Sequence, residues 1–233
     1  MQNPITKSPR LYTELDLFEG GTVELPKEQA HYLKNVLRKS EGDQVRLFNG
    51  RDGEWVYSLS AMGKKGAEAR SQEPIRPQTQ QGRKIHAYFP PIKKNRMDFM
   101  IEKAVELGVT DLHPILTQNT ETRKINEERL KAQIIEAAEQ CERLDLPVLH
   151  PLVDIFTALN TCKSPVYAAI ERMDTPTRIG DERADIAVLI GPEGGFTAEE
   201  IHRMMALPKL KAVSLGDNIL RAETALLKLL SLL

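Results

Sequence analysis

The sequence predicts an α/β protein in which a small β-rich domain precedes a larger domain with a mostly parallel sheet. The first part of the chain has short alternating segments between glycine turns. A segment rich in proline and glutamine follows. Beyond it, strand-like apolar runs alternate with helix-like periodic segments. We therefore expect a small β-barrel at residues 1–73, a linker at 74–83 and an α/β domain at 84–233.

The N-terminal domain carries one clear hairpin signal. Residues 44–48 and 55–59 alternate polar and apolar side chains around the turn Asn49–Gly53. Residues 12–18 are predicted to form a further strand. Pro26 is predicted to open a helical stretch that runs to Arg38, because proline is tolerated in the first turn of a helix.

Strand and helix signals alternate after the linker. Strands are expected at residues 84–89, 112–116, 147–149, 166–170, 186–190 and 212–215. Helices are expected at residues 95–107, from Asn126 onward, after Thr197 and at 220–233. The continuous apolar run at 186–190 is typical of a buried parallel strand. Thr197 and Glu200 have the spacing of a capping box.

The composition excludes several classes of protein. A net charge of -1 excludes a polycation, so any RNA contact must use local basic patches. The two cysteines form no CxxC pair, and the five histidines show no metal-ligand spacing, so we expect reduced thiols and no metal. The N-terminus has no apolar signal segment, and residues 219–233 are too short to span a bilayer. We expect a cytoplasmic protein with no membrane partner.

The segment Leu189–Thr197, with the sequence LIGPEGGFT, runs from a predicted buried strand into a capped helix. Such loops bind ligands at the carboxyl ends of parallel strands, and its three glycines permit close backbone approach. It is neither a P-loop, which needs Gly-Lys-Ser/Thr, nor a GxGxxG dinucleotide loop. A plain turn between strand and helix would need only one glycine.

The segment Val213–Ala225, with the sequence VSLGDNILRAETA, repeats the pattern of strand, glycine turn and helix. Arg221 lies near the predicted helix start, where the helix dipole disfavours a cation. It is therefore either a solvated surface residue or a residue kept for a ligand or substrate. Glu223 has a simpler explanation, since an acid in the first turn of a helix is common.

These two loops resemble the second and third motifs of the SPOUT methyltransferases. The stretches EKAVELGV at Glu102–Val109 and EAAEQCERLDLPVL at Glu136–Leu149 resemble one branch, the RsmE family of 16S rRNA uracil-N3 methyltransferases. His31–Gly50 resembles the small PUA-like RNA-binding domain of that branch. The segment Asn119–Lys124 departs from its pattern.

The resemblance implies a C-terminal deep trefoil knot, a homodimer, and S-adenosylmethionine as the methyl donor to a uridine of 16S rRNA, within the small ribosomal subunit. Backbone groups of three loops, which begin at Ile170–Arg172, would hold the adenine. The implied cofactor-binding residues are Ile170, Ile190, Gly191, Glu193, Gly194, Gly195, Leu215, Gly216, Ile219, Leu220, Thr224 and Ala225.

The chemistry of the acceptor assigns roles to Arg221 and Glu223. Uracil N3 carries a proton at neutral pH and is a poor nucleophile until that proton leaves. Arg221 is the candidate for stabilising negative charge on the carbonyl oxygens. Glu223 is a second candidate, as a base or as the residue that orients Arg221. The sequence leaves the proton acceptor and the target nucleotide open.

Two further expectations concern partners. Arg10, His31, Lys34 and Arg38 are expected to touch RNA phosphates, since residues 31, 34 and 38 would share one helical face. The apolar run of the last helix predicts a homodimer that buries Leu226, Leu230 or Leu233.

Three alternatives remain open at this stage. A 2′-O-ribose methyltransferase of the same fold would have a similar third motif. A non-catalytic RNA-binding protein with a degenerate knot would not need three glycines and Arg221. A phosphate site at the helix N-terminus is disfavoured by the charge of Glu193.

Overall fold

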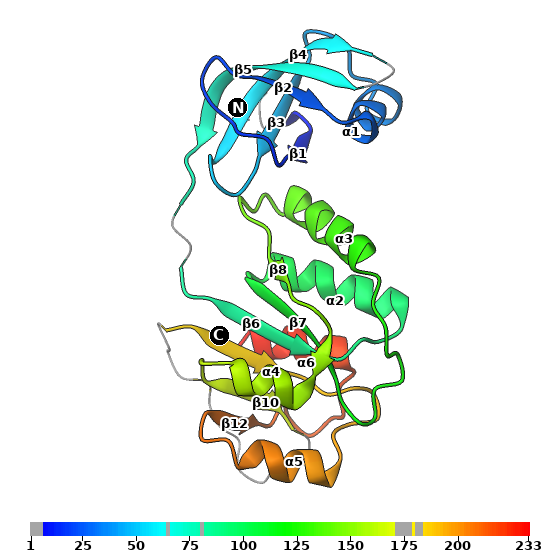
Figure 1. Ribbon diagram of the computed structural model, residues 1–233, viewed down its shortest axis with the longest axis vertical. Coiled ribbons are helices and arrows are strands. Elements are labelled where there is room, and N and C mark those ends of the chain that lie inside the picture. The colour runs from blue at the N-terminus through cyan, green and yellow to red at the C-terminus, as the bar shows by residue number, and fades with distance from the viewer. Residues whose placement is uncertain (1–6, 64–65, 80–81, 171–178, 180–183) are drawn as a thin grey trace. The chain divides into compact units, whose positions relative to one another are not determined.

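The computed structural model describes residues 7–63, 66–79, 82–170, 179 and 184–233. They divide into two compact units (Figure 1). Met1–Gln80 and Ala138–Leu146 form the first unit, and Gln81–Ala137 and Pro147–Leu233 form the second. Segment 138–146 therefore belongs with the N-terminal part of the chain.

The first unit is built on a sheet with strand order β1-β3-β4-β5-β2. Its strands are β1 (Arg10–Tyr12), β2 (Thr22–Leu25), β3 (Gln44–Phe48), β4 (Glu54–Met62) and β5 (Ala67–Arg76). β1 runs parallel to β3, and the other pairs are antiparallel. Apolar side chains from alternate strand positions, such as Val45, Leu47 and Leu59, form its core.

The expected hairpin at residues 44–59 is confirmed, but other details of this unit differ from the prediction. The strand predicted at 12–18 is wrong, because β1 ends at Tyr12. β5 runs to Arg76, three residues past the expected end of the domain, because Pro74 and Arg76 pair with β4. The helical stretch consists of α1 (Lys27–His31) and a π-helical turn (Tyr32–Val36).

A buried ionic cluster fastens segment 138–146 into the first unit. The fully buried Glu54 pairs with Arg10 at 3.0 Å and with Arg46 at 3.3 Å. Nε of Arg76 donates to Glu54 Oε2 at 2.6 Å. The Arg10 guanidinium also donates to the carbonyl oxygens of Ala138 (2.7 Å) and Arg143 (2.6 Å). Arg10 is therefore a structural residue of the interior.

The second unit contains a sheet of seven strands in the order β12-β10-β11-β6-β7-β8, with β9 paired to β7. All the strand pairs in the described residues are parallel. Its strands are β6 (Ile85–Phe89), β7 (Asp111–Leu116), β8 (Val148–Leu149), β9 (Val153–Asp154), β10 (Val166–Ala169), β11 (Ile186–Leu189) and β12 (Leu210–Val213). Its helices are α2 (Lys94–Glu106), α3 (Glu127–Gln140), α4 (Ile155–Thr161), α5 (Ala198–Met205) and α6 (Ala222–Leu230), although the last turn of α3, from Ala138 on, belongs to the first unit.

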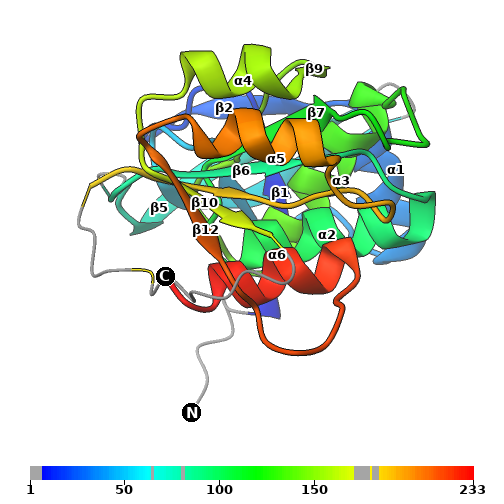
Figure 2. The same cartoon turned by 90° about the horizontal axis from the view of Figure 1, so that it is seen from below.

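Helices cover both faces of this sheet (Figure 2). α4 and α5 lie on one face, where Leu159 and Met204 pack with Tyr88, Ala187 and Leu189 of the strands. α2 and α6 lie against each other on the opposite face. A parallel sheet buried on both sides is the architecture that the apolar run at 186–190 predicts.

The strand and helix pattern of this unit agrees with the prediction, apart from β9 and α4, which were not predicted. The capping box is confirmed, since Glu200 N donates to Thr197 Oγ1 and Thr197 N donates to Glu200 Oε2. α6 begins at Ala222 rather than at Leu220, and Arg221 is its N-cap residue. None of the described helices is long and apolar enough to cross a membrane.

Candidate active site

A pocket of about 590 Å³ opens at the carboxyl ends of β10, β11 and β12. This volume suits a nucleoside-sized ligand, and the edge is where open α/β sheets bind ligands. Its lining residues are Ala169, Ile170, Gly191, Pro192, Glu193, Gly195, Phe196, Ile201, Val213, Ser214, Leu215, Gly216, Asp217, Asn218, Ile219, Leu220, Ala222 and Ala225.

Most of the expected cofactor residues meet in this pocket. Those that line it are Ile170, Gly191, Glu193, Gly195, Leu215, Gly216, Ile219, Leu220 and Ala225. Three others are not among the lining residues: Ile190 is fully buried, Thr224 is exposed, and Gly194 lies against Asn119. Glu171 and Arg172 of the first expected loop lie outside the described residues.

The first glycine loop, residues 191–196, is fixed by a neighbouring loop that the sequence did not assign to the site. Nδ2 of Asn119 donates to the carbonyl oxygens of Gly194 and Gly195, each at 3.1 Å. The backbone N of Gln118 donates to Glu200 Oε1 at 2.8 Å, so the capping glutamate joins both loops. Gly195 has φ +67°, a conformation that favours glycine. The segment that departs from the family pattern thus positions the loop.

The second glycine loop, residues 214–220, is fastened to the helix that follows it. Nζ of Lys228 on α6 donates to the carbonyl oxygen of Leu215 at 2.6 Å. Gly216 has φ +103°, which a side chain at this position would strain. These two features hold the loop backbone in one conformation beside the pocket.

Arg96 of α2 connects two acids of the site. Its guanidinium lies 3.4 Å from Glu193 Oε1 and 3.9 Å from Glu223 Oε1. Glu223 is buried, and among the described residues its Oε2 has no hydrogen-bond partner. Sequence reasoning missed this role of Arg96, because the contact joins residues about a hundred positions apart in the chain.

Arg221 and Glu223 flank the pocket without being among its lining residues. Arg221 is exposed, with extended backbone angles (φ -68°, ψ 155°), between the lining residues Leu220 and Ala222. Within the part of the chain that the structure describes, no hydrogen bond or ion pair is recorded for its side chain. Its guanidinium is free to meet a substrate beside the pocket.

The structure divides the four residues expected to contact RNA. His31 and Lys34 are exposed on successive turns of the helical stretch. Arg38 is also exposed, but it lies beyond the helix and has φ 55°, so the shared helical face holds for only two of the residues. The assignment of Arg10 is wrong, because Arg10 is buried against Glu54 and stacked over the Phe48 ring.

Comparison with known proteins defines the class of protein first. A model described as the RNA methyltransferase domain matches residues 79–233, and one described as the RNA methyltransferase PUA domain matches residues 25–70. Among curated relatives, ribosomal RNA small subunit methyltransferase E of Rickettsia conorii is 35% identical over 94% of this chain and 92% of its own length. The chain belongs to the family of ribosomal RNA small subunit methyltransferase E.

Two solved structures agree over nearly the whole chain. The same-named enzyme from Neisseria gonorrhoeae, bound to S-adenosylmethionine, has a TM-score of 0.84 and 31% identity and covers 96% of this chain and 95% of its own. A methyltransferase from Legionella pneumophila, also in complex with that cofactor, has a TM-score of 0.84 and 30% identity, with 97% and 96% covered. The predicted α/β fold class with a PUA-like domain is confirmed, and the trefoil knot stays a prediction.

Proposed function

We propose that this chain transfers a methyl group from S-adenosylmethionine to N3 of a uridine in small-subunit ribosomal RNA. The observation that carries the proposal is the pocket that both glycine loops build at the carboxyl ends of β10, β11 and β12. Family membership supports the reaction class, and solved relatives at 30–31% identity hold the same cofactor.

The residues of the pocket fit this cofactor. Apolar side chains such as Ile170, Leu215 and Ile219 can pack against the faces of an adenine ring. The acids among the lining residues, Glu193 and Asp217, complement a ligand that carries a sulfonium and an ammonium. The same two acids disfavour a free phosphate in this pocket, which was the third alternative.

When bound, S-adenosylmethionine supplies an electrophilic methyl group that needs little acid–base help. The acceptor needs more help, and we assign this role to Arg221 and Glu223. Arg221 would donate to a uracil carbonyl oxygen and stabilise the charge that develops as the N3 proton leaves. Glu223 is the second candidate, as acceptor of that proton or as the residue that orients Arg221. Arg96 lies 3.9 Å from its Oε1, and its buried Oε2 has no hydrogen-bond partner among the described residues. Because N3 is used in base pairing, the target must be single-stranded or flipped.

The direct test is to incubate the chain with methyl-labelled cofactor and either free 16S rRNA or small ribosomal subunits, and to map the product. Label on uracil N3 is expected. Label on a ribose would instead support the 2′-O-methyltransferase alternative. Absence of label on both substrates would support a non-catalytic RNA-binding protein.

Replacing Gly216 with valine is expected to weaken cofactor binding by at least about tenfold. A β-branched residue at φ +103° carries roughly 1–3 kcal/mol of backbone strain, which the loop relieves by changing its path in the pocket. Calorimetric titration with S-adenosylmethionine measures the effect. Gly108→Val is the matched control, because Gly108 also has a positive φ (+85°) and is not a lining residue. Equal cofactor affinities in both variants would contradict this role of the loop.

We propose that the first domain positions the RNA, with His31, Lys34 and Arg38 on its contact surface. All three are exposed, and Tyr32, 40% exposed beside them, adds an aromatic ring on which a base can stack. We keep the division into a first domain, a linker and a methyltransferase domain (residues 1–73, 74–83 and 84–233) as a proposal, with the first domain extended to Arg76 by β5.

The double variant Lys34→Ala/Arg38→Asn should bind RNA more weakly and with a flatter salt dependence. Each lost phosphate contact reduces the slope of log affinity against log salt by about 0.7–0.9. Asparagine tolerates the positive φ at position 38, so charge is removed with little strain. RNA affinity measured at several salt concentrations reports the change. Arg51→Ala is the control, since Arg51 is already paired with Asp16 at 2.8 Å. An unchanged slope would place the contact surface elsewhere.

We also propose a homodimer, but its surface differs from the one expected. Leu226 and Leu230 are buried within the chain itself and cannot form it. Near the last helix, Ile219 and Leu232 are the large apolar residues that stay exposed, at 68% and 50%. Leu233 is half-buried. Sedimentation of the active chain as a monomer would contradict the dimer.

A further inference from the structure

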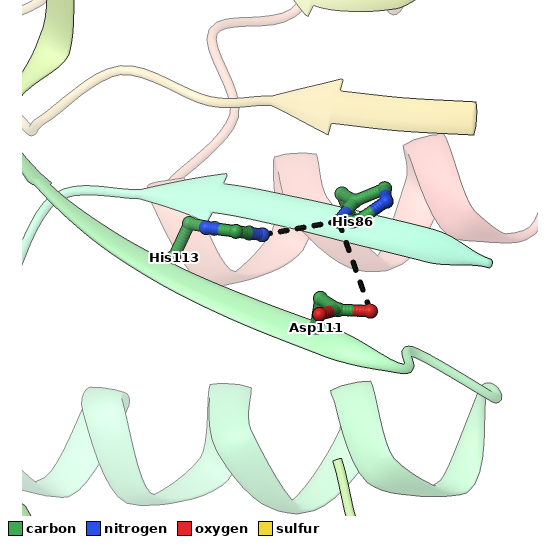
Figure 3. A group of neighbouring side chains, drawn as sticks. All are labelled: His86, Asp111 and His113. Carbon is green, nitrogen blue, oxygen red and sulfur yellow. Dashed lines mark hydrogen bonds and ion pairs between the residues drawn. The ribbon is translucent and has the colours of Figure 1, made fainter. Parts of the chain in front are cut away.

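A cluster of imidazole and carboxylate groups lies at the other end of the second unit's sheet. His86 on β6 and Asp111 on β7 are register partners at the amino ends of these strands. His113 follows two residues after Asp111 and therefore points to the same face. Figure 3 shows the three side chains turned toward one another between the two strands. Sequence spacing gave no sign of this, because the pairing of β6 with β7 brings the residues together.

The separations within the cluster suit one shared ion. Nδ1 of His86 lies 3.1 Å from Nε2 of His113 and 3.7 Å from Oδ2 of Asp111 (Figure 3). All three candidate ligand atoms lie within 4.8 Å of one another. In a tetrahedral site with metal–ligand distances of about 2.0–2.1 Å, neighbouring ligand atoms lie about 3.3–3.4 Å apart. This value falls between the 3.1 Å from His86 to His113 and the 3.7 Å from His86 to Asp111.

A fourth residue, His150, orients the carboxylate. Its Nε2 lies 2.8 Å from Asp111 Oδ1, and a carboxylate can only accept, so Nε2 carries the proton. The Thr110 hydroxyl donates to the other oxygen, Oδ2, at 2.8 Å, so Asp111 is held on both sides. Its ring also stacks on His113, with centroids 3.9 Å apart. A carboxylate held through its second oxygen in this way is the usual arrangement around protein-bound metals.

Burial and hydrogen bonds shift the pKa values of all three side chains. Burial, together with the neighbouring His150 and His86, lowers the pKa of His113 to about 3. Burial also lowers the pKa of His86. Burial alone would raise the pKa of Asp111, but hydrogen bonds from His150 and Thr110 hold it below its usual value.

We propose that His86, Asp111 and His113 form a binding site for a divalent transition metal of the Zn²⁺ type, with His150 as the residue that positions Asp111. Two imidazoles and one carboxylate match the ligand preference of Zn²⁺, whereas Mg²⁺ and Ca²⁺ prefer oxygen ligands alone. The His86 side chain is 18% exposed, which leaves a path for the ion and an open coordination position for water.

This site is separate from the pocket for the methyl donor. The pocket follows the carboxyl ends of β10, β11 and β12, and the cluster lies at the amino ends of β6 and β7 in the same parallel sheet. An ion here would join two adjacent strands, so its expected effect is to stabilise the second unit.

The experiment titrates Zn²⁺ into the chelator-treated, full-length chain, prepared without a polyhistidine tag, and follows the heat of binding. We expect saturable binding of one ion per chain and none of Mg²⁺ under the same conditions. Co²⁺ should give visible absorption bands of a nitrogen- and oxygen-ligated ion without a sulfur charge-transfer band. That spectrum excludes the exposed thiol of Cys141 as the site.

Three variants locate the ion. His86→Gln and Asp111→Asn should each weaken Zn²⁺ binding by more than the roughly 10- to 100-fold expected for the positioning variant His150→Ala. His202→Ala is the matched control, because His202 is exposed on α5 away from the cluster. Unchanged affinity for S-adenosylmethionine shows that each variant is folded. If the wild-type chain shows no saturable Zn²⁺ binding, or binds it as tightly as His86→Gln and Asp111→Asn do, the cluster is only a hydrogen-bonded network and the proposal is wrong.

Discussion

Replacing Arg221 with alanine is expected to lower the single-turnover methylation rate by about 10²-fold or more, with RNA and cofactor affinities changed far less. Arg221 is the exposed N-cap residue of α6, between two residues that line the pocket. A helix N-terminus disfavours a cation, so a negatively charged partner would stabilise Arg221 there. A substrate carbonyl oxygen that gains negative charge during transfer would be such a partner.

Two comparisons make this prediction specific. Arg221→Lys keeps the charge but loses the planar fork of donors, so it should recover only part of the rate. Arg203→Ala removes another exposed arginine of the second unit, on α5, and should leave the rate near that of the wild type. Rapid-quench measurement with saturating cofactor isolates the transfer step from binding. A wild-type rate in Arg221→Ala would refute the assigned role and leave the family membership intact.

Replacing Glu54 with alanine is expected to destabilise the first unit by about 3–5 kcal/mol, because it leaves buried charges without their partner. Glu54 is fully buried and pairs with Arg10, Arg46 and Arg76. Its loss would leave adjacent guanidiniums that repel one another. It would also loosen Arg10, which holds the carbonyl oxygens of Ala138 and Arg143.

The measurement can be confined to the first unit. The chain has one tryptophan, Trp55, next to Glu54 on β4, so its fluorescence during urea unfolding reports this unit. Glu142→Ala is the control, since Glu142 pairs with Arg46 but its side chain is 48% exposed, and its loss should cost at most about 1 kcal/mol. Similar unfolding midpoints for the two variants would show that burial of Glu54 adds nothing.

Sequence patterns were reliable where local chemistry decides the structure. The apolar run at 186–190 predicted the buried strand β11, and the spacing of Thr197 and Glu200 predicted the start of α5. The two glycine loops likewise carried enough of their identity in neighbouring residues to indicate the class of protein. Each of these features depends on residues within a few positions of one another, so the sequence displays it directly.

Local patterns misled where a distant contact decides. The sequence suggested that Arg10 is a surface cation. In the folded chain it is buried, because it pairs with Glu54, which lies 44 positions away in the sequence. Leu226 and Leu230 suggested an interface, but packing of α6 against the sheet and α2 buries them within the chain. Arg38 does not share a helical face with His31 and Lys34, because the helical stretch ends in a π-helical turn at Val36 and Arg38 has a positive φ.

Local residue patterns were enough to predict the α/β class, the two pocket loops and the family. Three contacts became evident only in the folded chain: Asn119 holds the first loop, Arg96 joins Glu193 to Glu223, and His86 lies beside Asp111 and His113. The physical reason is strand and helix pairing. Parallel strands pair only through long crossovers, so residues that share a site at their ends are far apart in the chain and leave no joint pattern in it.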